Sequence, residues 1–419
     1  MNIQPSDTPQ DRCPVHWPRA IILLDMNAFF AAIEQRDHPE WRGRPLAITN
    51  GVQGTCVITC SYEARALGVK TGMHLRQARQ LCPELIQCPA RPYRYAAVST
   101  AIMQALTTIT PDVEVFSVDE AFLDVTHCQR LHGTPVRMAR WAQRRVYETS
   151  GLLCSVGVSG DKTTAKYAAK LDKPNGFTVI PPWEARARLR DVPVTELCGI
   201  NRGIGRFLAA HGVHTCGDMA RLPISVLARR FGNPGRRIWY MAQGADPENV
   251  RLSVAAPKSV GHGKVVPPHT RDRQTLLVYL EHMAEKVAAR LRRHHLQASH
   301  FFIGLRLRAG WLGDKPRTRF PTDDGAQIMA LCRRFLAAMW RGEPVSQVQI
   351  TALNPQPANT QLDLFQYTDE RRNRVNAAQD AVNERYGEFT LAPARLLNRS
   401  SMPNVIAPAW KPSGHRKTV

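Results

Sequence analysis

Two stretches of this chain predict strands that bring carboxyl groups to one place. Residues 20–24 (AIILL) are purely apolar and stop at Asp25, which is typical of a buried strand that ends in an acid. Further along, the alternating residues 112–118 meet Asp119 and Glu120, after which a strand-like pattern resumes. If the two stretches are neighbours, the three carboxyl groups lie at one edge of a sheet. The alternative, which the pattern alone leaves open, is that they are unrelated acids in turns.

Carboxylates that share one edge repel one another, and burial raises the cost of their charges further. A cation removes this cost, and hard oxygen ligands of this kind suit Mg²⁺, which keeps some of its water and shares the phosphates of a substrate. A pair of such ions could activate an attacking hydroxyl and stabilise a leaving oxygen in phosphoryl transfer. The sequence therefore predicts a candidate magnesium site for phosphate chemistry.

The charge balance indicates a polyanionic partner. Among 419 residues there are 56 Lys and Arg against 35 Asp and Glu, a formal net charge of +21. This surplus favours a nucleic acid or an anionic membrane surface, but no apolar run reaches the roughly 18 residues that would span a bilayer. The first residues lack the layout of a secretory signal. The ten cysteines form no CxxC pair, which favours a reducing cytoplasm and speaks against a zinc site or a disulfide framework.

Sequence patterns divide the chain into several parts. Short strands and helices alternate in its first part, with strands predicted at 45–49 and 55–59 and a glycine turn predicted at 157–160. Residues 192–245 have helical spacing interrupted by glycines, which predicts a separate small helical domain. The pattern lapses at 246–257, which we interpret as a linker.

A basic block follows the linker. It spans residues 258–355 and contains 16 basic and 7 acidic residues, a net charge of +9, which is denser than the chain average. Its periodicity predicts two helices, at 275–296 and 326–339, and two strands, at 301–308 and 345–353. The remaining tail is polar and proline-rich and contains one predicted helix, at 369–386.

Four motifs carry a resemblance to a known family. They are ILLDMNAFFAAIE at 22–34, SYEARALGV at 61–69, SVDEAFLDVT at 117–126 and KPNG at 173–176. Together they resemble the Y-family translesion DNA polymerases, above all the bacterial DNA polymerase IV branch. The resemblance implies error-prone, template-directed DNA synthesis on primer–template DNA with deoxynucleoside triphosphates. It also implies a monomeric cytoplasmic enzyme that associates with the nucleoid when it is on DNA.

The resemblance further implies an α+β multidomain fold, the right-hand arrangement of polymerases. The implied parts are a leader (1–18), a palm (19–30 and 92–180), small fingers (31–91), a helical thumb with a helix-hairpin-helix (181–245), the linker (246–257), an α+β little finger (258–355) and the tail (356–419).

Roles in the site follow from the resemblance, residue by residue. Asp25, Asp119 and Glu120 are expected to hold two Mg²⁺ ions, and the backbone carbonyl of Met26 is an additional ligand. The expected contacts to the triphosphate are Thr59, Tyr62, Arg65 and Lys173. These residue types suit the task, because hydroxyls orient phosphates while Arg and Lys neutralise their charge.

Phe30, five residues after Asp25, resembles the steric gate of the family. A flat ring under the sugar would clash with a 2′-hydroxyl and so select deoxynucleotides; the alternative is an ordinary core phenylalanine. Asn27 departs from the pattern, because many members have Asp there, although the catalytic subunit of DNA polymerase V is similar to this chain at that position. Asn27 is not an expected metal ligand, so the departure does not put activity in serious doubt.

Two regions are expected to hold DNA. LCGINR at 197–202 resembles the helix-hairpin-helix of the thumb, in which a glycine turn lets backbone N–H groups approach a phosphate. Gly199 is the turn glycine, and Asn201, which tolerates the left-handed conformation, replaces the usual second one; a plain helical hairpin is the alternative. In the basic block the candidate phosphate contacts are Arg306, Arg308, Arg317 and Arg319. Each could be a solvated charge, but jointly they predict binding that depends steeply on salt.

The tail contains a short apolar motif, QLDLF, in polar surroundings. Exposed apolar anchors of this kind usually have a partner that receives them. The motif resembles the binding motif for the bacterial sliding clamp, and its residues are Gln361, Leu362, Asp363, Leu364 and Phe365. The alternative is a segment that docks back on its own protein.

Two other functions are compatible with such a fold. A non-catalytic DNA-binding paralogue that recruits other polymerases through the clamp would be expected to lack the three carboxylates, which this chain has. A metal-dependent nuclease on the same scaffold is disfavoured by the triphosphate-type contacts expected at Tyr62, Arg65 and Lys173.

Overall fold

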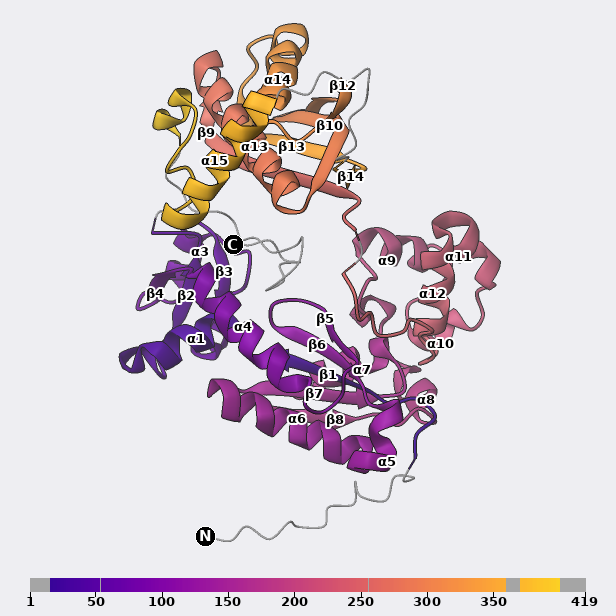
Figure 1. Ribbon diagram of the computed structural model, residues 1–419. Coiled ribbons are helices and arrows are strands. Elements are labelled where there is room, and N and C mark those ends of the chain that lie inside the picture. Colours follow the sequence, from indigo (N-terminus) through magenta and orange to yellow (C-terminus); the bar gives the residue numbers. More distant parts are fainter. Residues whose placement is uncertain (1–15, 53, 255, 359–369, 400–419) are drawn as a thin grey trace. The chain divides into compact units, whose positions relative to one another are not determined.

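The computed structural model describes residues 16–52, 54–254, 256–358 and 370–399. The described residues form two compact units that divide after Val254, inside the segment interpreted as a linker (Figure 1). Among the described residues, no helix is both long enough and apolar enough to cross a membrane.

A five-stranded sheet forms the centre of the N-terminal unit, with strand order β5-β6-β1-β7-β8. Its strands are β1 (Ile21–Met26), β5 (Val113–Val115), β6 (Glu120–Asp124), β7 (Cys154–Ser159) and β8 (Phe177–Val179). β1 pairs antiparallel with both β6 and β7, whereas β7 and β8 are parallel. The strand that was predicted from its apolar run therefore lies in the middle of the sheet, with both edges hydrogen-bonded (Figure 1).

Helices cover both faces of this sheet. They are α4 (Pro92–Leu106), α5 (Gln129–His132), α6 (Pro135–Ser150) and α7 (Lys162–Leu171), with the 3₁₀ turn η3 (Thr126–Cys128). Ile22 and Leu24 of β1 pack into the core shared with α4 and α6, whereas Ile21 and Leu23 pack with α7. Alternate residues of β1 are buried on opposite faces, which is why every position before Asp25 has to be apolar.

The structure differs from the prediction at two points in this sheet. β1 does not stop at Asp25 but continues through Met26, because both residues still pair with β7. The turn predicted at 157–160 was wrong for Gly157, which lies inside β7. A Cβ there would lie 2.0 Å from the carbonyl oxygen of Ala165, so this glycine is required by the close approach of α7 to the strand.

A smaller sheet of three strands, in the order β3-β2-β4, lies in the same unit. Its strands are β2 (Leu46–Thr49), β3 (Val57–Cys60) and β4 (Ile86–Pro89), and the helices around it are α1 (Phe29–Asp37), η2 (Pro39–Trp41), α2 (Tyr62–Ala66) and α3 (Leu75–Leu81). The strands predicted at 45–49 and 55–59 are confirmed with small shifts of their boundaries, and they pair antiparallel.

Short helices follow, as predicted for 192–245. They are α8 (Ala185–Leu189), η4 (Val194–Glu196), α9 (Arg202–Ala209), α10 (Cys216–Met219), α11 (Ile224–Phe231) and α12 (Asn233–Met241). These helices share a core of their own that includes Leu208 and Leu227. The start of the interpreted linker is anchored, because buried Asp246 accepts a hydrogen bond from Thr163 Oγ1 at 2.7 Å and pairs with Arg237 at 2.8 Å.

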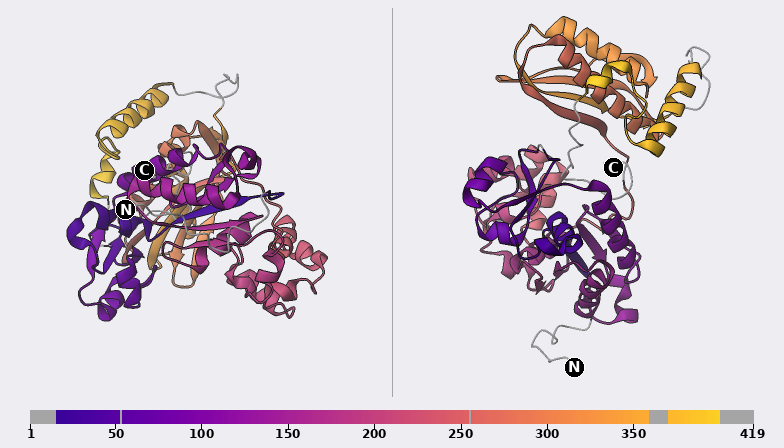
Figure 2. Two further views of the ribbon diagram at one scale, coloured as in Figure 1. Left: turned by 90° about the horizontal axis from the view of Figure 1, so that it is seen from below. Right: turned by 90° about the vertical axis from the view of Figure 1, so that its left-hand side faces the viewer.

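The C-terminal unit is a sheet with helices packed on one face. Its strands are β9 (Ser259–Thr270), β10 (Leu296–Leu307), β11 (Gly310–Asp314), β12 (Arg317–Thr322), β13 (Val345–Leu353) and β14 (Gln356–Pro357). The path runs β11-β10-β13-β9, and β12 and β14 also pair with β10. Helices α13 (Arg273–Arg293) and α14 (Gly325–Met339) lie across this sheet, and their apolar faces form its core (Figure 2). Both predicted helices and both predicted strands of the basic block are confirmed.

Part of the predicted tail belongs to this C-terminal unit. The predicted helix is α15 (Glu370–Tyr386), and a 3₁₀ turn, η5 (Ala394–Asn398), follows it. Asp380 of α15 accepts from Arg292 of α13 at 2.6 Å, and Arg395 pairs with Glu281 of α13 at 2.9 Å. These contacts hold the segment against α13, so it is an integral part of the unit. The motif at 361–365 lies outside the described residues.

Candidate active site

The pairing of β1 with β6 brings the three predicted carboxyl groups together. Asp25 and Glu120 are direct partners across two antiparallel strands, so their side chains project from the same face of the sheet. Asp119 immediately precedes Glu120, and its backbone carbonyl accepts a hydrogen bond from the Met26 N–H at 2.9 Å. Residues that are 94 positions apart in the chain thus meet at one site.

Two lysines engage these carboxylates. Lys173 Nζ lies 2.5 Å from Asp25 Oδ2, and Lys166 of α7 forms an ion pair with Glu120. Lys173 was expected here as a triphosphate contact, whereas Lys166 was not expected from the sequence. The site therefore combines negative charge on two strands with positive charge from α7 and from the loop that follows it.

Burial disfavours the negative charge of these carboxyl groups. Burial raises the pKa of Asp25 to about 7, against the lowering effect of Lys173, and the charge of Glu120 raises it further. Burial also raises the pKa of Asp119, although Ser117 Oγ, which donates to its Oδ1 at 2.5 Å, acts in the opposite direction. The site would therefore be stabilised by additional positive charge.

This donor set fits a hard divalent cation in its chemistry. Carboxylate and carbonyl oxygens are the ligands that Mg²⁺ prefers, and burial, which raises the pKa values of Asp25 and Asp119, disfavours their ionised forms unless a cation lies beside them. In the described part of the chain, however, no set of three His, Cys, Asp or Glu side chains is gathered closely enough to hold one ion. Lys173 and Lys166 each hold one of the carboxylates instead.

Asn27 connects the strand of the site to the loop that carries Lys173. Its side chain is buried, and its Nδ2 donates to Ser155 Oγ at 2.9 Å. Its Oδ1 accepts a hydrogen bond from the Asn175 N–H at 2.7 Å, and Ser155 Oγ accepts one from the Gly176 N–H at 3.2 Å. The residue that departs from the family pattern therefore has a defined structural role, which is to hold the KPNG loop beside β1.

Phe30 lies in the first turn of α1, directly after the strand that carries Asp25. It is 8% exposed, and its ring stacks on that of Tyr95 with centroids 4.3 Å apart and planes at 11°. The helix begins after Ala28, which adopts the left-handed conformation at φ 47°. Phe30 thus lies five residues after Asp25 with one face of its ring supported by Tyr95.

The other expected triphosphate contacts come from β3 and α2. Thr59 pairs with the central strand of the small sheet, and Ser61 caps α2 by accepting from the Ala64 N–H. The Arg65 guanidinium lies 4.8 Å from the centre of the Tyr62 ring. Burial raises the pKa of Tyr62, whereas the charge of Arg65 lowers it and that of Asp25 raises it.

The expected DNA contacts of the helical region are exposed. Gly199, at φ +92°, is the left-handed residue of its turn, and a Cβ added to it would meet no atom within 4 Å. Asn201 has a φ of −79°, so it does not use the left-handed conformation that an asparagine tolerates. It caps α9 instead, because its Oδ1 accepts from the N–H groups of Gly203 and Ile204 at 2.9 and 3.0 Å.

The four arginines expected to contact phosphates lie on the C-terminal unit and are exposed: Arg306, Arg308, Arg317 and Arg319. On β10 the buried residues Ile303 and Leu305 face the helices, so Arg306 projects from the open face of the sheet. Its guanidinium lies 5.8 Å from the ring centre of Trp311, which is 45% exposed. The open face of the sheet therefore presents exposed positive charge of the kind that suits a phosphate backbone.

Lys166 could have been found from a pattern in the sequence. Lysines recur at every fourth position of α7, which places them on one face of the helix. Each of them engages a glutamate, in the pairs Lys162–Glu114, Lys166–Glu120 and Lys170–Glu196. The spacing indicates the lysine stripe, but not which acids it meets.

Two family models match the chain. The impB/mucB/samB family matches residues 24–170, and the impB/mucB/samB family C-terminal domain matches residues 257–364. The chain belongs to the impB/mucB/samB family.

Several curated relatives of this chain are named DNA polymerase IV or DNA polymerase IV 1. A DNA polymerase IV of Moorella thermoacetica is 37% identical over 387 residues, which are 90% of this chain and 96% of the relative. A DNA polymerase IV of Pelotomaculum thermopropionicum is 32% identical over 392 residues, 92% of this chain and 96% of the relative. A DNA polymerase IV 1 of Bacillus subtilis is 32% identical over 394 residues, 91% of this chain and 94% of the relative.

A solved structure supports the same assignment. A Y-family DNA polymerase chimera of Dbh and Dpo4 matches with a TM-score of 0.71 and 27% identity, and it covers 81% of this chain and 99% of that chain. The expected resemblance to the Y-family polymerases is confirmed, and so is the α+β multidomain architecture with palm, fingers, thumb and little finger.

Proposed function

We propose that this chain, a DNA-directed DNA polymerase, carries out template-directed, error-prone synthesis past damaged and undamaged template bases. The primer 3′-oxygen attacks the α-phosphorus of a paired deoxynucleotide, the bond to the bridging oxygen breaks, and pyrophosphate leaves. One observation carries the proposal: Asp25 and Glu120 face each other across two strands beside Asp119, with Lys166 and Lys173 at the same site. Acids and bases in this combination suit transfer of a charged phosphoryl group.

Asp25, Asp119 and Glu120, together with the backbone carbonyl of Met26, would hold two Mg²⁺ ions. When bound, such ions promote ionisation of the attacking hydroxyl and stabilise the leaving oxygen. Lys173 is 2.5 Å from Asp25 and neutralises it. Lys173 would also be placed to neutralise the phosphates of a nucleotide bound beside these carboxylates.

The nucleotide would lie between the carboxylates and α2. Thr59 and Tyr62 orient the triphosphate with their hydroxyls, and Arg65 and Lys173 neutralise its charge. Phe30 would lie under the sugar, where its ring excludes a 2′-hydroxyl. The stacking of Phe30 on Tyr95 supports this role, because the Phe30 ring can exclude a 2′-hydroxyl only if it keeps its position.

DNA would be held through its backbone. The open turn at Gly199 exposes N–H groups to a phosphate, while Asn201 orders the first turn of the helix behind it. The exposed arginines of the C-terminal unit supply the larger part of the charge: Arg306, Arg308, Arg317 and Arg319. The interface should therefore be largely independent of base sequence.

Recruitment to replication sites would use residues 361–365, with Gln361 as a hydrogen-bonding residue and Leu364 and Phe365 as apolar anchors in the sliding clamp. Both flanks of this motif, β14 and α15, belong to the C-terminal unit. We further propose that the enzyme is a monomer that works in the cytoplasm, at the nucleoid when it is bound to DNA.

The test is primer extension on undamaged and abasic templates with Mg²⁺ and the four deoxynucleotides. Wild type should extend both primers, whereas Asp119→Ala should lose extension by several orders of magnitude while it still binds DNA. Glu148→Ala, which removes an exposed carboxylate of α6 that pairs only with Arg145 in the described part of the chain, is a matched control and should remain active.

Two results would contradict the proposal. If well-folded wild type binds DNA without extending a primer, the chain is a recruiting paralogue that works through its clamp motif. If it cleaves DNA in Mg²⁺ without nucleotides and Asp119→Ala removes this cleavage, the site belongs to a nuclease.

A further inference from the structure

We propose that Glu34 is a positioning residue that sets how strictly the Phe30 gate rejects ribonucleotides. The inference rests on the proposed role of Phe30 as a gate. Glu34 lies one helical turn after Phe30 on α1 and is 0% exposed. It acts on the gate through Tyr95 of α4, whose ring lies flat against that of Phe30 at 4.3 Å.

Two sets of side-chain contacts connect α1 with α4. The first is the aromatic stack of Phe30 on Tyr95, and the second is formed by Glu34 and Arg91 one turn away. Tyr95 takes part in both sets of contacts, because its hydroxyl also donates to Glu34 Oε1 at 2.7 Å. Arg91 contacts both oxygens of the same carboxylate: its Nε donates to Oε1 at 2.8 Å and its Nη2 lies 2.7 Å from Oε2.

Burial makes this arrangement stiff. Tyr95 is 0% exposed, and burial, together with its hydrogen bond to Glu34, raises the pKa of its hydroxyl, which therefore stays protonated and able to donate. The hydrogen bond to Glu34 likewise raises the pKa of Arg91, so this guanidinium stays charged. A buried carboxylate that lost these partners would carry an uncompensated charge, and the three side chains consequently hold one another in place.

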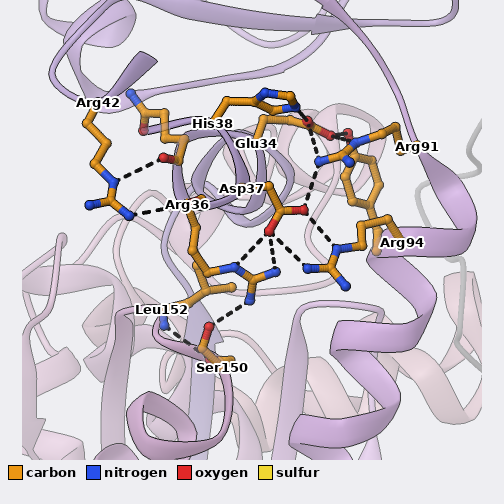
Figure 3. A network of polar contacts seen from close by, with 11 residues as sticks. Glu34, Arg36, Asp37, His38, Arg42, Arg91, Arg94, Ser150 and Leu152 are labelled. Carbon is orange, nitrogen blue, oxygen red and sulfur yellow. Dashed lines mark hydrogen bonds and ion pairs between the residues drawn. The ribbon is translucent and has the colours of Figure 1, made fainter. Parts of the chain in front are cut away.

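The network continues to a second carboxylate. Asp37 accepts from Arg91 at 2.9 Å, from Arg94 at 2.8 Å and from Arg36 at 2.9 Å, and Figure 3 shows it surrounded by these three arginines. In the described part of the chain its ion-pair partners are all arginines, whereas Glu34 also holds Tyr95. Asp37 thus serves as a matched comparison, since it shares the network but not the contact with the aromatic stack.

The rigidity of the Phe30–Tyr95 stack determines how well the enzyme discriminates against ribonucleotides. A ring that excludes a 2′-hydroxyl works only if it cannot recede, and Tyr95 occupies the space into which Phe30 would recede. Without Glu34 the Tyr95 hydroxyl loses its acceptor, so both rings gain freedom to shift. Because a displacement of about 1 Å can change a rate by about 100-fold, even a small shift admits ribonucleotides.

The experiment measures single-nucleotide incorporation of a deoxynucleotide and of the matching ribonucleotide and takes the ratio of kcat/KM as the selectivity. Glu34→Ala should lower this ratio by about 10- to 100-fold, mainly through faster ribonucleotide incorporation. Glu34→Gln should retain most of it, because the amide oxygen still accepts from Tyr95. Tyr95→Phe, which keeps the ring and removes the hydroxyl, should lower it by about fivefold. Asp37→Asn should leave it unchanged.

The outcomes separate this inference from the proposed function. Unchanged selectivity in Tyr95→Phe and Glu34→Ala, while Phe30→Ala loses it, overturns the role of Glu34 and leaves the gate intact. Unchanged selectivity in Phe30→Ala removes the gate and the inference with it. An equal loss in Asp37→Asn means general loosening of the network and also overturns the inference. If Glu34→Ala does not fold, Tyr95→Phe decides, because its volume is nearly that of the native residue.

Discussion

At the scale of single residues, the site depends on polar groups that bind no substrate. Asn27 has one donor and one acceptor in use, toward Ser155 and the backbone of Asn175. Through them it holds the loop from which Lys173 reaches Asp25. Both ends of this side chain thus have a partner, and buried polar groups of this kind are costly to leave without partners.

Asn27→Ala should therefore weaken nucleotide binding more than it weakens the chemical step. Removal of the hydrogen bond to Asn175 loosens the loop, and Lys173 then spends less time near the phosphates. The KM for the incoming nucleotide should rise by about tenfold, which corresponds to about one hydrogen bond to a charged or ordered group. Steady-state incorporation kinetics measure this change.

Asn27→Asp is the comparison for this variant, because a carboxylate can still accept from the Asn175 N–H. Its KM should stay closer to that of wild type. If Asn27→Ala has an unaltered KM, the loop is held by other contacts and Asn27 has no positioning role.

At the scale of elements, the packing of α7 on β7 positions one of the two lysines. Gly157 lets the helix approach so closely that a Cβ would lie 2.0 Å from Ala165 O and 2.4 Å from Ala169 N. The same helix carries Lys166 to Glu120. The distance between helix and sheet therefore determines whether this ion pair forms at the site.

Gly157→Ala should destabilise the protein by about 3 kcal/mol, because the added methyl group meets backbone atoms that cannot move independently. Urea unfolding measures the change in the free energy of unfolding. Gly203→Ala is the comparison, since its Cβ would meet only Asn201 Oδ1, at 3.2 Å. A loss below about 0.5 kcal/mol in Gly157→Ala would show that α7 can retreat from the strand without cost.

The packing of α13 against β9 buries histidines among cations. His282 is 4% exposed, and its ring meets that of Phe389 edge-on at 4.7 Å. Burial lowers the pKa of His282 to about 3, and the charge of Lys264 lowers it further. Burial has the same effect on His262 of β9, whose pKa is also about 3.

Acid should consequently open this part of the C-terminal unit. The unfolded chain takes up a proton on each histidine near pH 6.5, whereas the folded unit resists it until about pH 3, so stability is full above about pH 6.5 and falls as pH drops below it. We expect the hydrogen exchange of the α13 backbone amides in the whole chain, after correction for intrinsic exchange rates, to become faster as the pH is lowered from about 7.5 to about 5.5. His282→Gln should make this dependence shallower; an identical dependence in the variant would assign it to other groups.

At the scale of the whole molecule, positive and negative charges are concentrated in different parts of the chain. The net charge of +21 is not spread evenly: residues 258–355 carry +9, a higher density than the rest of the chain, whereas Asp25, Asp119 and Glu120 meet at one site. Four of its arginines lie exposed on the C-terminal unit. Affinity for DNA and chemistry on the nucleotide can thus vary independently.

DNA binding should weaken steeply with salt, and the slope should report the number of phosphates that the protein neutralises. Removal of one such arginine should reduce the slope of log K against log salt by about 0.9 for duplex DNA, so Arg317→Ala combined with Arg319→Ala should reduce it by about 2. Arg333→Ala, on the exposed side of α14, should leave the slope nearly unchanged. Equal effects of both variants would mean that net charge alone, and no defined contact, holds the DNA.

Much of the architecture could be predicted because its signals are local. The apolar run before Asp25 predicts a strand buried on both faces, and the periodicity of the basic block predicts its two helices. The ends of the elements were predicted less well, since β1 extends to Met26. Gly157, which suggested a turn, lies in a strand. A glycine signals either a turn or a close contact, and only the packing partner distinguishes the two.

The sequence by itself determined the family, the division of the chain into parts, several of the strands and helices and the presence of three acids next to strand-like runs. Only the tertiary structure decided that Lys166 meets Glu120, that Asn27 holds the KPNG loop and that Glu34 supports the ring behind Phe30. These contacts join side chains from segments that are far apart in the chain. Neither residue of such a pair leaves a periodic or compositional signal of its partner, because each contact is created by the packing of elements and not by neighbours in sequence.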